Sequence, residues 1–448
     1  MATVVEAKDR YAASFEVFSE SAGGGDWLRD VRRQAFERFS ELGFPTKRDE
    51  DWKFTNVAPI ASVEFERANG ASVDAADLGA FRLPDVECSR LVFVDGRYAE
   101  RLSTLTDLPE GVLAGSLADA IAVGDGSGDG TLERHLARYA DYRSDAFTAL
   151  NTAFIEDGGV VHVPRGVVVE QPVHLLFVSS EAEQPTITHP RTLIVAEEQS
   201  QITVVEEYVS LGGGVHFSNV VTELVAGDNA VVSHYVIERE NEEAFNVGTL
   251  RIQQGRTSNV ASHSVLLGGR LVRNNVHPVM GGEGGYCLIN GLFMPRGRQH
   301  MDNFMWVEHA SPHCDSRQFY NGILSDRSHG VFSGRIVVHK DAQKTDAKQT
   351  NRNLLLSGDA RIDSKPQLEI YADDVKCTHG ATIGQIDPDA VFYLCSRGIS
   401  EDQAREMLLF AFAGENLDRM ECSPVRAYAE ALVAERLPTA RPRPRPRL

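Results

Sequence analysis

The stretch SNVVTELVAGDNAVVSHYVIE, residues 218–238, contains two runs of apolar and β-branched residues separated by the turn sequence Gly-Asp-Asn. Val, Ile, Thr and Tyr favour strands, whereas Gly, Asp and Asn favour the turn between them. Comparable runs recur roughly every 10 to 15 residues from residue 152 to residue 396, with almost no helical periodicity between them. The phrase SGDARID at 357–363 resembles AGDNAVV at 226–232, which indicates degenerate repetition. The pattern predicts a mainly β region built from repeated strand and turn units.

Three architectures use many short strands, and the length and motifs of this region distinguish them. A seven-stranded sandwich is too small for about 240 residues. No WD or kelch signature marks the blades of a propeller. A solenoid of stacked coils accommodates irregular loops of the kind seen between these runs. We therefore predict a parallel β-helix, which is a solenoid, over residues 152–396.

Helical periodicity marks the N-terminal region, residues 1–151. The segment WLRDVRRQAFERFSEL at 27–42 repeats apolar residues at three- and four-residue steps, and Gly43 and Pro45 follow it as stop signals. The segment LERHLARYADYRSDAFTALNTAF at 132–154 has a similar rhythm and predicts a second helix. We expect this region and the C-terminal helices to cap the ends of the solenoid, because free strand edges invite association.

The C-terminal region, residues 397–440, begins with a helix signal. Ser400 and Gln403 form a capping box, and Gly414 is expected to end the helix. A second helix is predicted over residues 424–436. Residues 441–448 alternate Arg with Pro and are expected to form an extended, solvated tail. The apolar stripe of the first helix consists of Ala404, Met407, Leu408, Ala411 and Phe412.

Composition limits the class of protein. The chain has 448 residues, of which 42% are hydrophobic and 24% charged, as in folded soluble proteins. The net charge of −19 argues against nucleic acid as a partner, because phosphate binding needs a cationic surface. There is no run of 18 apolar residues that would predict a membrane span, and the first residues lack the pattern of a secretory signal. We expect a cytoplasmic protein that does not bind membranes.

The sequence lacks the common catalytic motifs. It contains no P-loop, no HExxH and no GxSxG nucleophile elbow. Its six cysteines form no CxxC pair, so we expect free thiols and no zinc finger. GDGSGDG at 124–130 lacks the flanks of a dinucleotide loop and the final Glu of a calcium loop, and we interpret it as an acidic linker. A β-helix enzyme acting on carbohydrate is an alternative, although such enzymes need converging acids and are usually secreted.

The stretch YADDVKCTHGATIG, residues 371–384, places a thiol and an imidazole two residues apart. If residues 368–379 form one strand, Cys377 and His379 share a face with Tyr371, Asp373 and Val375. Thiolate and imidazole both bind iron, copper or zinc, but two ligands do not complete a site. The residues alone leave metal binding and core packing open. We interpret the remaining histidines of this part of the chain as structural, namely His300, His309, His313, His329 and His339.

Two segments carry a family resemblance. DAQKTDAKQTNRNLLLSGDARIDSKPQLEIYADDVKCTHGATIGQID at 341–387 and PTKRDEDWKFTNV at 45–57 closely resemble the SufD branch of the SufB/SufD family, which belongs to the SUF iron–sulfur cluster assembly machinery. The similarity extends from about residue 25 to residue 436. Cys395 and the Arg-Pro tail depart from the family pattern, which often has Arg at the position of Cys395.

The resemblance implies a right-handed parallel β-helix flanked by helical N- and C-terminal regions, without independent catalysis. It implies a scaffold subunit that pairs with SufB through the β-helix and helps to supply iron for a nascent cluster at that interface. The family's interface histidine matches His379, and Cys377 is a further candidate ligand. The ABC-type ATPase SufC would dock on the C-terminal helices, for which the apolar stripe is suited.

The same resemblance sets expectations for cofactors and for alternatives. No cofactor is expected to stay bound to the isolated chain, and iron or a nascent cluster would be held only transiently in the complex. The isolated chain could form a homodimer through the strand edge meant for SufB, since an unpaired edge invites association. The related alternative is a SufB-type subunit that holds a cluster by itself.

Overall fold

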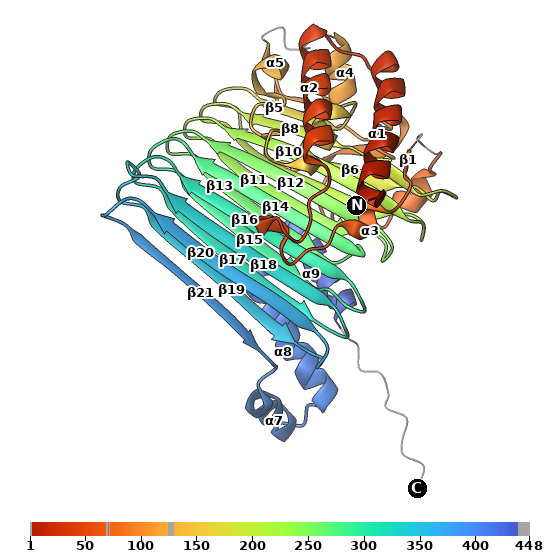
Figure 1. The fold of residues 1–448 in the computed structure, drawn as a ribbon. Coiled ribbons are helices and arrows are strands. Elements are labelled where there is room, and N and C mark those ends of the chain that lie inside the picture. The colour runs from red at the N-terminus through yellow and green to blue at the C-terminus, as the bar shows by residue number, and fades with distance from the viewer. Residues whose placement is uncertain (1, 69, 71, 124–129, 438–448) are drawn as a thin grey trace.

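The computed structural model describes residues 2–68, 70, 72–123 and 130–437. Most of the predicted acidic linker (124–129) and the predicted Arg-Pro tail lie outside the described residues. A parallel β-solenoid forms the centre of the molecule, with helices at both ends of the chain (Figure 1). The predicted mainly β, parallel β-helix fold is confirmed. No helix within the described ranges is long and apolar enough to cross a membrane.

Two sheets run along the solenoid, and from β8 onward successive strands alternate between them. The strands of successive coils pair in parallel and in register. The similar phrases at 226–232 and 357–363 both contain turns between strands, as predicted. Sheet A consists, in order, of β4 (Leu113–Ser116), β5 (Gly159–Val163), β8 (Arg191–Ala196), β10 (His216–Ala226), β12 (Phe245–Gln254), β14 (Leu271–Met280), β16 (His300–His309), β18 (His329–Val338) and β20 (Arg361–Ile370). In addition, β7 (Thr186–Thr188) pairs with β10, and β1 (Glu66–Arg67) pairs with β7. Sheet B consists of β3 (Arg97–Tyr98), β2 (Ser89–Val94), β6 (Val173–Ser179), β9 (Gln201–Ser210), β11 (Val231–Arg239), β13 (Asn259–Leu266), β15 (Tyr286–Phe293), β17 (Asp315–Leu324), β19 (Asp346–Leu355) and β21 (Lys376–Gly384).

The main core lies between the two sheets. Alternate residues of each strand point inward, and in-register pairing stacks them on the residues of the next coil. The interior is close-packed, as Gly291 of β15 shows: a Cβ atom at this position would lie 2.0 Å from the ring of Tyr320 in β17. Only glycine therefore fits beneath this ring. The buried cluster includes Leu224, Val260, Ile289 and Phe332.

The N-terminal region covers the outer face of sheet A over its first coils (Figure 1). Helix α2 (Asp26–Leu42) ends at Gly43, as predicted. Phe39 and Phe147 pack in one cluster with Phe217 and Phe245, which point outward from β10 and β12. The region also contains α1 (Ala2–Ser21), α3 (Ala58–Ala61), α4 (Leu117–Val123), α5 (Thr131–His135) and α6 (Ala146–Ala153), and the short 3-10 helices η1 (Glu50–Trp52), η2 (Ala75–Leu78) and η3 (Glu100–Leu102).

The single helix predicted over 132–154 is wrong, because the segment between α5 and α6 is not helical. The Glu223 carboxylate of β10 accepts hydrogen bonds from the backbone N–H groups of Ala137, Tyr139 and Ala140 at 2.7, 2.7 and 2.9 Å. The same carboxylate is paired with buried Arg191 at 2.6 Å. A buried acceptor from a distant strand thus takes the donors that a continuous helix would use internally.

Three helices follow the solenoid, namely α7 (Pro388–Ser396), α8 (Glu401–Leu417) and α9 (Ser423–Arg436). The capping box of Ser400 and Gln403 is confirmed, but α8 continues past Gly414 to Leu417. Helices α8 and α9 pack on the outer face of sheet B, where Leu409 and Val433 join a cluster with outward residues of its strands. The expectation that these helices cap the last coil is therefore wrong, and β20 and β21 end the two sheets.

Candidate functional site

The last coil of the solenoid is open in the described part of the chain. Strand β20 pairs only with β18 and β21 only with β19, so each sheet ends in a free edge. Apolar side chains are exposed there, since Ile383 of β21 is 54% exposed and Ile370 at the end of β20 is 40% exposed. The opposite end differs, because β4 and β2 extend the sheets and the N-terminal region packs around them. The open coil is thus an unprotected strand edge of the kind that associates with another chain.

Cys377 and His379 both lie on β21 and share its inward face. Their register partners on β19 are Ala347 and Gln349, both buried. Cys377 is half-buried against the interior cluster that contains Ala347, and burial raises the pKa of its thiol. His379, two residues further along β21 on the same face, is exposed. The imidazole is therefore the more available ligand of the two.

The predicted strand over 368–379 is not continuous. Strand β20 ends at Ile370, a turn follows, and β21 begins at Lys376. Tyr371, Asp373 and Val375 therefore do not share a strand face with Cys377 and His379. The turn is needed because the chain must cross from sheet A to sheet B in every coil.

No group of three or more His, Cys, Asp or Glu side chains is arranged to hold a metal ion among the described residues. His379 would thus need ligands from another molecule to complete a site. His309 and His313 do not share a helix, because His309 ends β16 and His313 lies in a turn with φ of 59°. Burial lowers the pKa of His309 to about 4, and its Nε2 lies 2.8 Å from the hydroxyl of Ser316, as befits a structural histidine.

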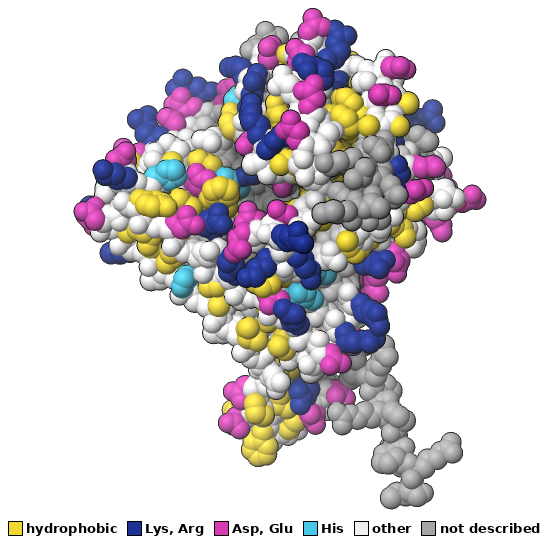
Figure 2. All heavy atoms as spheres, in the orientation of Figure 1, with side chains coloured by type: hydrophobic (Ala, Val, Ile, Leu, Met, Phe, Trp, Pro, Cys, Tyr) yellow, Lys and Arg dark blue, Asp and Glu magenta, His cyan; other side chains and the backbone are white. Residues whose placement is uncertain are grey.

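The C-terminal helices expose an apolar surface. On α7, Phe392 is 74% and Tyr393 57% exposed, and on α8 Met407 is 52% and Phe410 38% exposed. Hydrophobic side chains gather over α7 at the lower end of the molecule (Figure 2). The residues of the predicted stripe differ in burial. Ala404 is buried, Leu408 and Phe412 are half-buried, and Met407 and Ala411 are exposed. The face of α8 that packs on sheet B carries Leu409, Ala413 and Leu417 instead.

Helix α8 is fixed to sheet B by a buried asparagine. The Nδ2 group of Asn416 donates to Asn290 Oδ1 at 2.9 Å and to the carbonyl oxygen of Gly291 at 2.8 Å, both on β15. In return, Asn290 donates to the carbonyl of Asn416 at 2.9 Å, and Asn321 of β17 donates to the carbonyl of Phe412 at 3.1 Å. These bonds join the C-terminal half of α8 to two strands of the solenoid.

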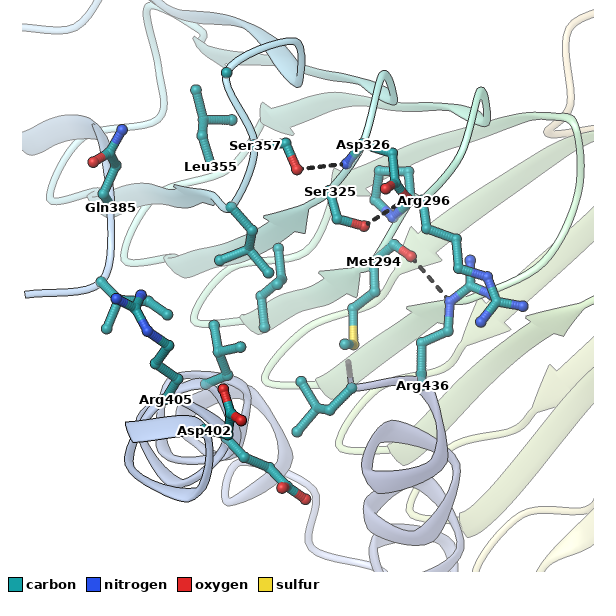
Figure 3. Close-up of a pocket in the computed structure, with 18 of the residues that line it drawn as sticks. Met294, Arg296, Ser325, Asp326, Leu355, Ser357, Gln385, Asp402, Arg405 and Arg436 are labelled. Carbon is teal, nitrogen blue, oxygen red and sulfur yellow. Dashed lines mark hydrogen bonds between the residues drawn. The ribbon is translucent and has the colours of Figure 1, made fainter. Parts of the chain in front are cut away.

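The N-terminal half of α8 borders an open cleft of about 840 Å³ (Figure 3). Asp402 and Arg405 of α8 face the loops that follow β15, β17 and β19 across it. At its rim, Arg436 of α9 donates to the carbonyl of Met294 at 3.2 Å. Helix α8 is therefore held at one end and less closely packed at the other.

Comparison with known proteins assigns this architecture to a family. The family model for the SUF system FeS cluster assembly SufBD core domain matches residues 177–412, which include the open coil, α7 and most of α8. The chain belongs to the SufBD family. The model for the SufBD protein N-terminal region matches residues 7–175.

SufBD relatives cover nearly the whole chain. The iron–sulfur cluster assembly SufBD family protein of Synechocystis is 35% identical over 91% of this chain and 90% of its own length. The iron–sulfur cluster assembly protein SufD of Escherichia coli is 33% identical over 91% of this chain and 92% of its own length. SufD of Bacillus subtilis is 26% identical over 93% and 95%. The resemblance to SufD is thus confirmed, and the chain is a SufD-like iron–sulfur cluster assembly protein.

Sequence reasoning missed part of the exposed surface of this SufBD chain. Phe392 and Tyr393 were assigned to the solenoid, although they lie on α7. The signal was present, since Asp387 followed by Pro388 is a typical helix start, and the Asp387 side chain accepts from the N–H of Asp389. Phe410 was missed because it falls outside the apolar stripe that periodicity selects on α8.

Proposed function

We propose that the chain is a non-catalytic scaffold subunit of an iron–sulfur cluster assembly complex, which pairs with SufB through the open coil. The observation that supports this pairing most directly is the difference between the two ends of the solenoid. The first coil is covered by the N-terminal region, whereas β20 and β21 leave both sheets with a free edge. A partner that presents two matching edges can extend both sheets at once by backbone hydrogen bonding.

In this proposal His379 contributes an imidazole to the interface at which a nascent cluster forms. Iron and the cluster are cargo of the complex, and the other ligands come from SufB. A neutral imidazole is a competent ligand for iron. Cys377 is the weaker candidate, because its half-buried thiol is less readily ionised.

The second interface in the proposal is the surface formed by α7 and α8, on which the ATPase SufC docks. The chain contains no P-loop, so energy from ATP must reach it from a partner. Exposed aromatic residues such as Phe392 and Tyr393 are typical anchors of protein interfaces. Because Asn416 joins α8 to β15, movement of the docked helices would pull on sheet B and open the paired edge.

Co-expression with SufB and SufC, followed by size-exclusion chromatography, tests the two interfaces separately. Ile383→Lys at the open coil should release SufB and keep SufC, whereas Phe392→Asp should release SufC and keep SufB. Val17→Asp, which places the same charge as Phe392→Asp on an exposed apolar residue elsewhere (69% exposed), should retain both partners. Retention of all partners by both interface variants would contradict the proposal.

The metal role of His379 has its own test. His379→Ala should leave the complex assembled but lower the iron and sulfide that it acquires, because only a ligand has been removed. His313→Ala, also an exposed histidine, is the matched control and should assemble clusters normally. Unchanged cluster content in His379→Ala would refute the assignment. The isolated chain provides a further check, since a homodimer through the same edge should become monomeric in Ile383→Lys.

A further inference from the structure

Two imidazoles face each other on the outer surface of sheet A, away from the open coil. His300 begins β16 and His329 begins β18, and the two residues are direct register partners. Their Nδ1 atoms lie 3.0 Å apart, and their rings are 4.7 Å apart between centroids and inclined at 71°. The segment 45–57 of the N-terminal region contacts His300 through Thr55. The positions of the ring protons follow from the groups that contact the other two nitrogens.

His329 must carry its proton on Nε2. This nitrogen lies 2.7 Å from Oδ2 of Asp363 on β20. Asp363 is paired with Arg361 at 2.8 Å and therefore acts as an ionised acceptor. A carboxylate cannot donate, so Nε2 of His329 is the donor. In the neutral ring, Nδ1 of His329 then presents a lone pair.

His300 must also carry its proton on Nε2. This nitrogen lies 2.9 Å from the hydroxyl oxygen of Thr55. Thr55 has a single hydroxyl hydrogen and donates it to the carboxylate of Asp302, which is in turn paired with Arg273. The hydroxyl oxygen can thus only accept from His300, whose Nδ1 is left with a lone pair. With both rings neutral, two lone pairs would therefore meet at 3.0 Å, which is unfavourable unless a proton or a metal ion lies between them.

The geometry suits a metal ion at this position. If the two rings were collinear, their centroids would lie further apart than 4.7 Å, so the rings meet at an angle. An ion about 2.1 Å from each nitrogen, the usual metal–imidazole distance, would see them at roughly a right angle. The two nitrogens are thus spaced like neighbouring ligands of one ion.

The donors and their surroundings select the class of ion. Nitrogen ligands suit zinc, copper, iron and nickel, whereas calcium and magnesium prefer oxygen. The neighbouring carboxylates of Asp302 and Asp363 are each paired with an arginine. Asp363 holds His329 in place directly, and Asp302 holds His300 in place through Thr55. Histidines that bind metals usually have their second nitrogen fixed in this way. In addition, Oδ1 of Asp302 is buried without a hydrogen-bond partner within the described residues.

We infer that His300 and His329 form a binding site for a first-row divalent transition metal, coordinated through the two Nδ1 atoms with water completing the shell. The His329 side chain is 26% exposed, which gives the ion access. The ion would join β16 and β18, and through Thr55 it would also fasten the segment 45–57 to the solenoid. This site lies on the outer face of sheet A and uses no residue of the proposed cluster interface, so the two proposals can fail independently.

Metal titration of the untagged, EDTA-treated full chain tests the site. Zn²⁺ binding by calorimetry should lose one equivalent in the double variant His300→Gln/His329→Gln. The matched control is His277→Gln/His339→Gln, whose histidines on the same sheet contact opposite oxygens of the Glu308 carboxylate. This control should bind as many equivalents as the unaltered chain. Equal stoichiometry in the His300/His329 variant, with an unchanged circular dichroism spectrum, would overturn the inference.

Two further measurements do not depend on removing a ligand. Asp363→Asn should weaken Zn²⁺ binding about 10- to 100-fold while keeping the stoichiometry, because it loosens the orientation of His329. Nitrogen NMR of the metal-free chain with labelled histidines should show both rings protonated at Nε2, and Zn²⁺ should shift both Nδ1 resonances. A proton held on Nδ1 of His329 that Zn²⁺ does not displace would show that the pair binds a proton instead, which would refute the metal site.

Discussion

Replacement of Asn416 by Ala should weaken the attachment of α8 to the solenoid without unfolding the strands. The side chain is fully buried, and its Nδ2 group donates to Asn290 Oδ1 at 2.9 Å and to the carbonyl of Gly291 at 2.8 Å. The variant removes both hydrogen bonds, together with a longer one to the carbonyl of Phe319 at 3.3 Å, and leaves the amide oxygen of Asn290 buried without this donor. The hydrogen bond from Asn290 to the backbone carbonyl of Asn416 does not involve the removed side chain and can persist.

The magnitude follows from these contacts. Two hydrogen bonds contribute about 0.5–1.5 kcal/mol each, and a buried acceptor left without a donor costs about 1–3 kcal/mol more. The sum is about 3 kcal/mol, which corresponds to roughly a hundredfold change in the equilibrium for local opening. Because Leu409 and Leu417 still bury their side chains against sheet B, the helix should open more often but remain docked on average.

Hydrogen exchange of the full chain measures this effect. Amides of α8 should lose about a hundredfold of protection in Asn416→Ala, whereas amides of β10 and β12 should not change. Asp418→Ala, an exposed neighbour at the end of the same helix, is the control and should leave exchange unaltered. Less than a tenfold change in α8, or an equal change in the strands, would refute the view that Asn416 anchors the helix. If the chain works in the complex proposed above, the same variant should uncouple ATP hydrolysis from cluster formation.

Three further changes test the packing of the solenoid. Tyr428→Phe removes the hydrogen bond of 2.8 Å from α9 to the buried Glu207 carboxylate, and should cost about 1–2 kcal/mol of α9 docking by hydrogen exchange. Burial raises the pKa of Glu238 to about 8, so this carboxyl keeps its proton in the folded chain at pH values where the unfolded chain, with the ordinary pKa of 4.5, has released it. The free energy of unfolding should therefore fall as the pH rises from about 4.5 to 8, by at most about 1.4 kcal/mol per pH unit, and Glu238→Gln should reduce this slope in denaturant titrations. Gly291→Ala forces a Cβ atom into a tyrosine ring and should lower the midpoint of thermal unfolding, whereas Gly380→Ala, with nothing within 4 Å of its Cβ position, should not.

The two ends of the solenoid explain how one fold can act as a scaffold. A parallel solenoid buries its core only between successive coils. The strand edges at its ends can therefore associate with other chains unless another element covers them. In this chain the N-terminal region covers the first coil, and the C-terminal helices lie on the outer face of sheet B instead of over the last coil. The proposed SufB interface and the proposed ATPase surface are thus on separate parts of the molecule.

Local sequence signals predicted the features that depend on neighbouring residues. The alternation and turn chemistry of 218–238 predict strands and a turn, because side-chain direction in a strand and the φ preference of turn residues are local properties. The start of α8 was also predictable, since the capping box of Ser400 and Gln403 satisfies backbone groups three residues apart. The resemblance predicted His379 as an interface residue beside an unpaired strand edge, whereas the expectation that the C-terminal helices cap the last coil was wrong.

Features that depend on distant residues required the tertiary structure. The break between α5 and α6 arises from a carboxylate on β10, which is about 85 residues away in sequence and carries no local signal. The buried face of α8 is chosen by the shape of sheet B, so Leu409 and Leu417 face the core while Met407 faces solvent.

The sequence by itself determined a parallel β-solenoid with helical flanks and a SufD-like family membership. Only the tertiary structure decided that the last coil is left open, that α8 is anchored through Asn416, and that His300 and His329 face each other. The physical reason is that secondary structure follows from short-range backbone and side-chain preferences. The exposure of the last coil, the anchoring of α8 and the contact between His300 and His329 depend instead on which strands become neighbours when the coils stack.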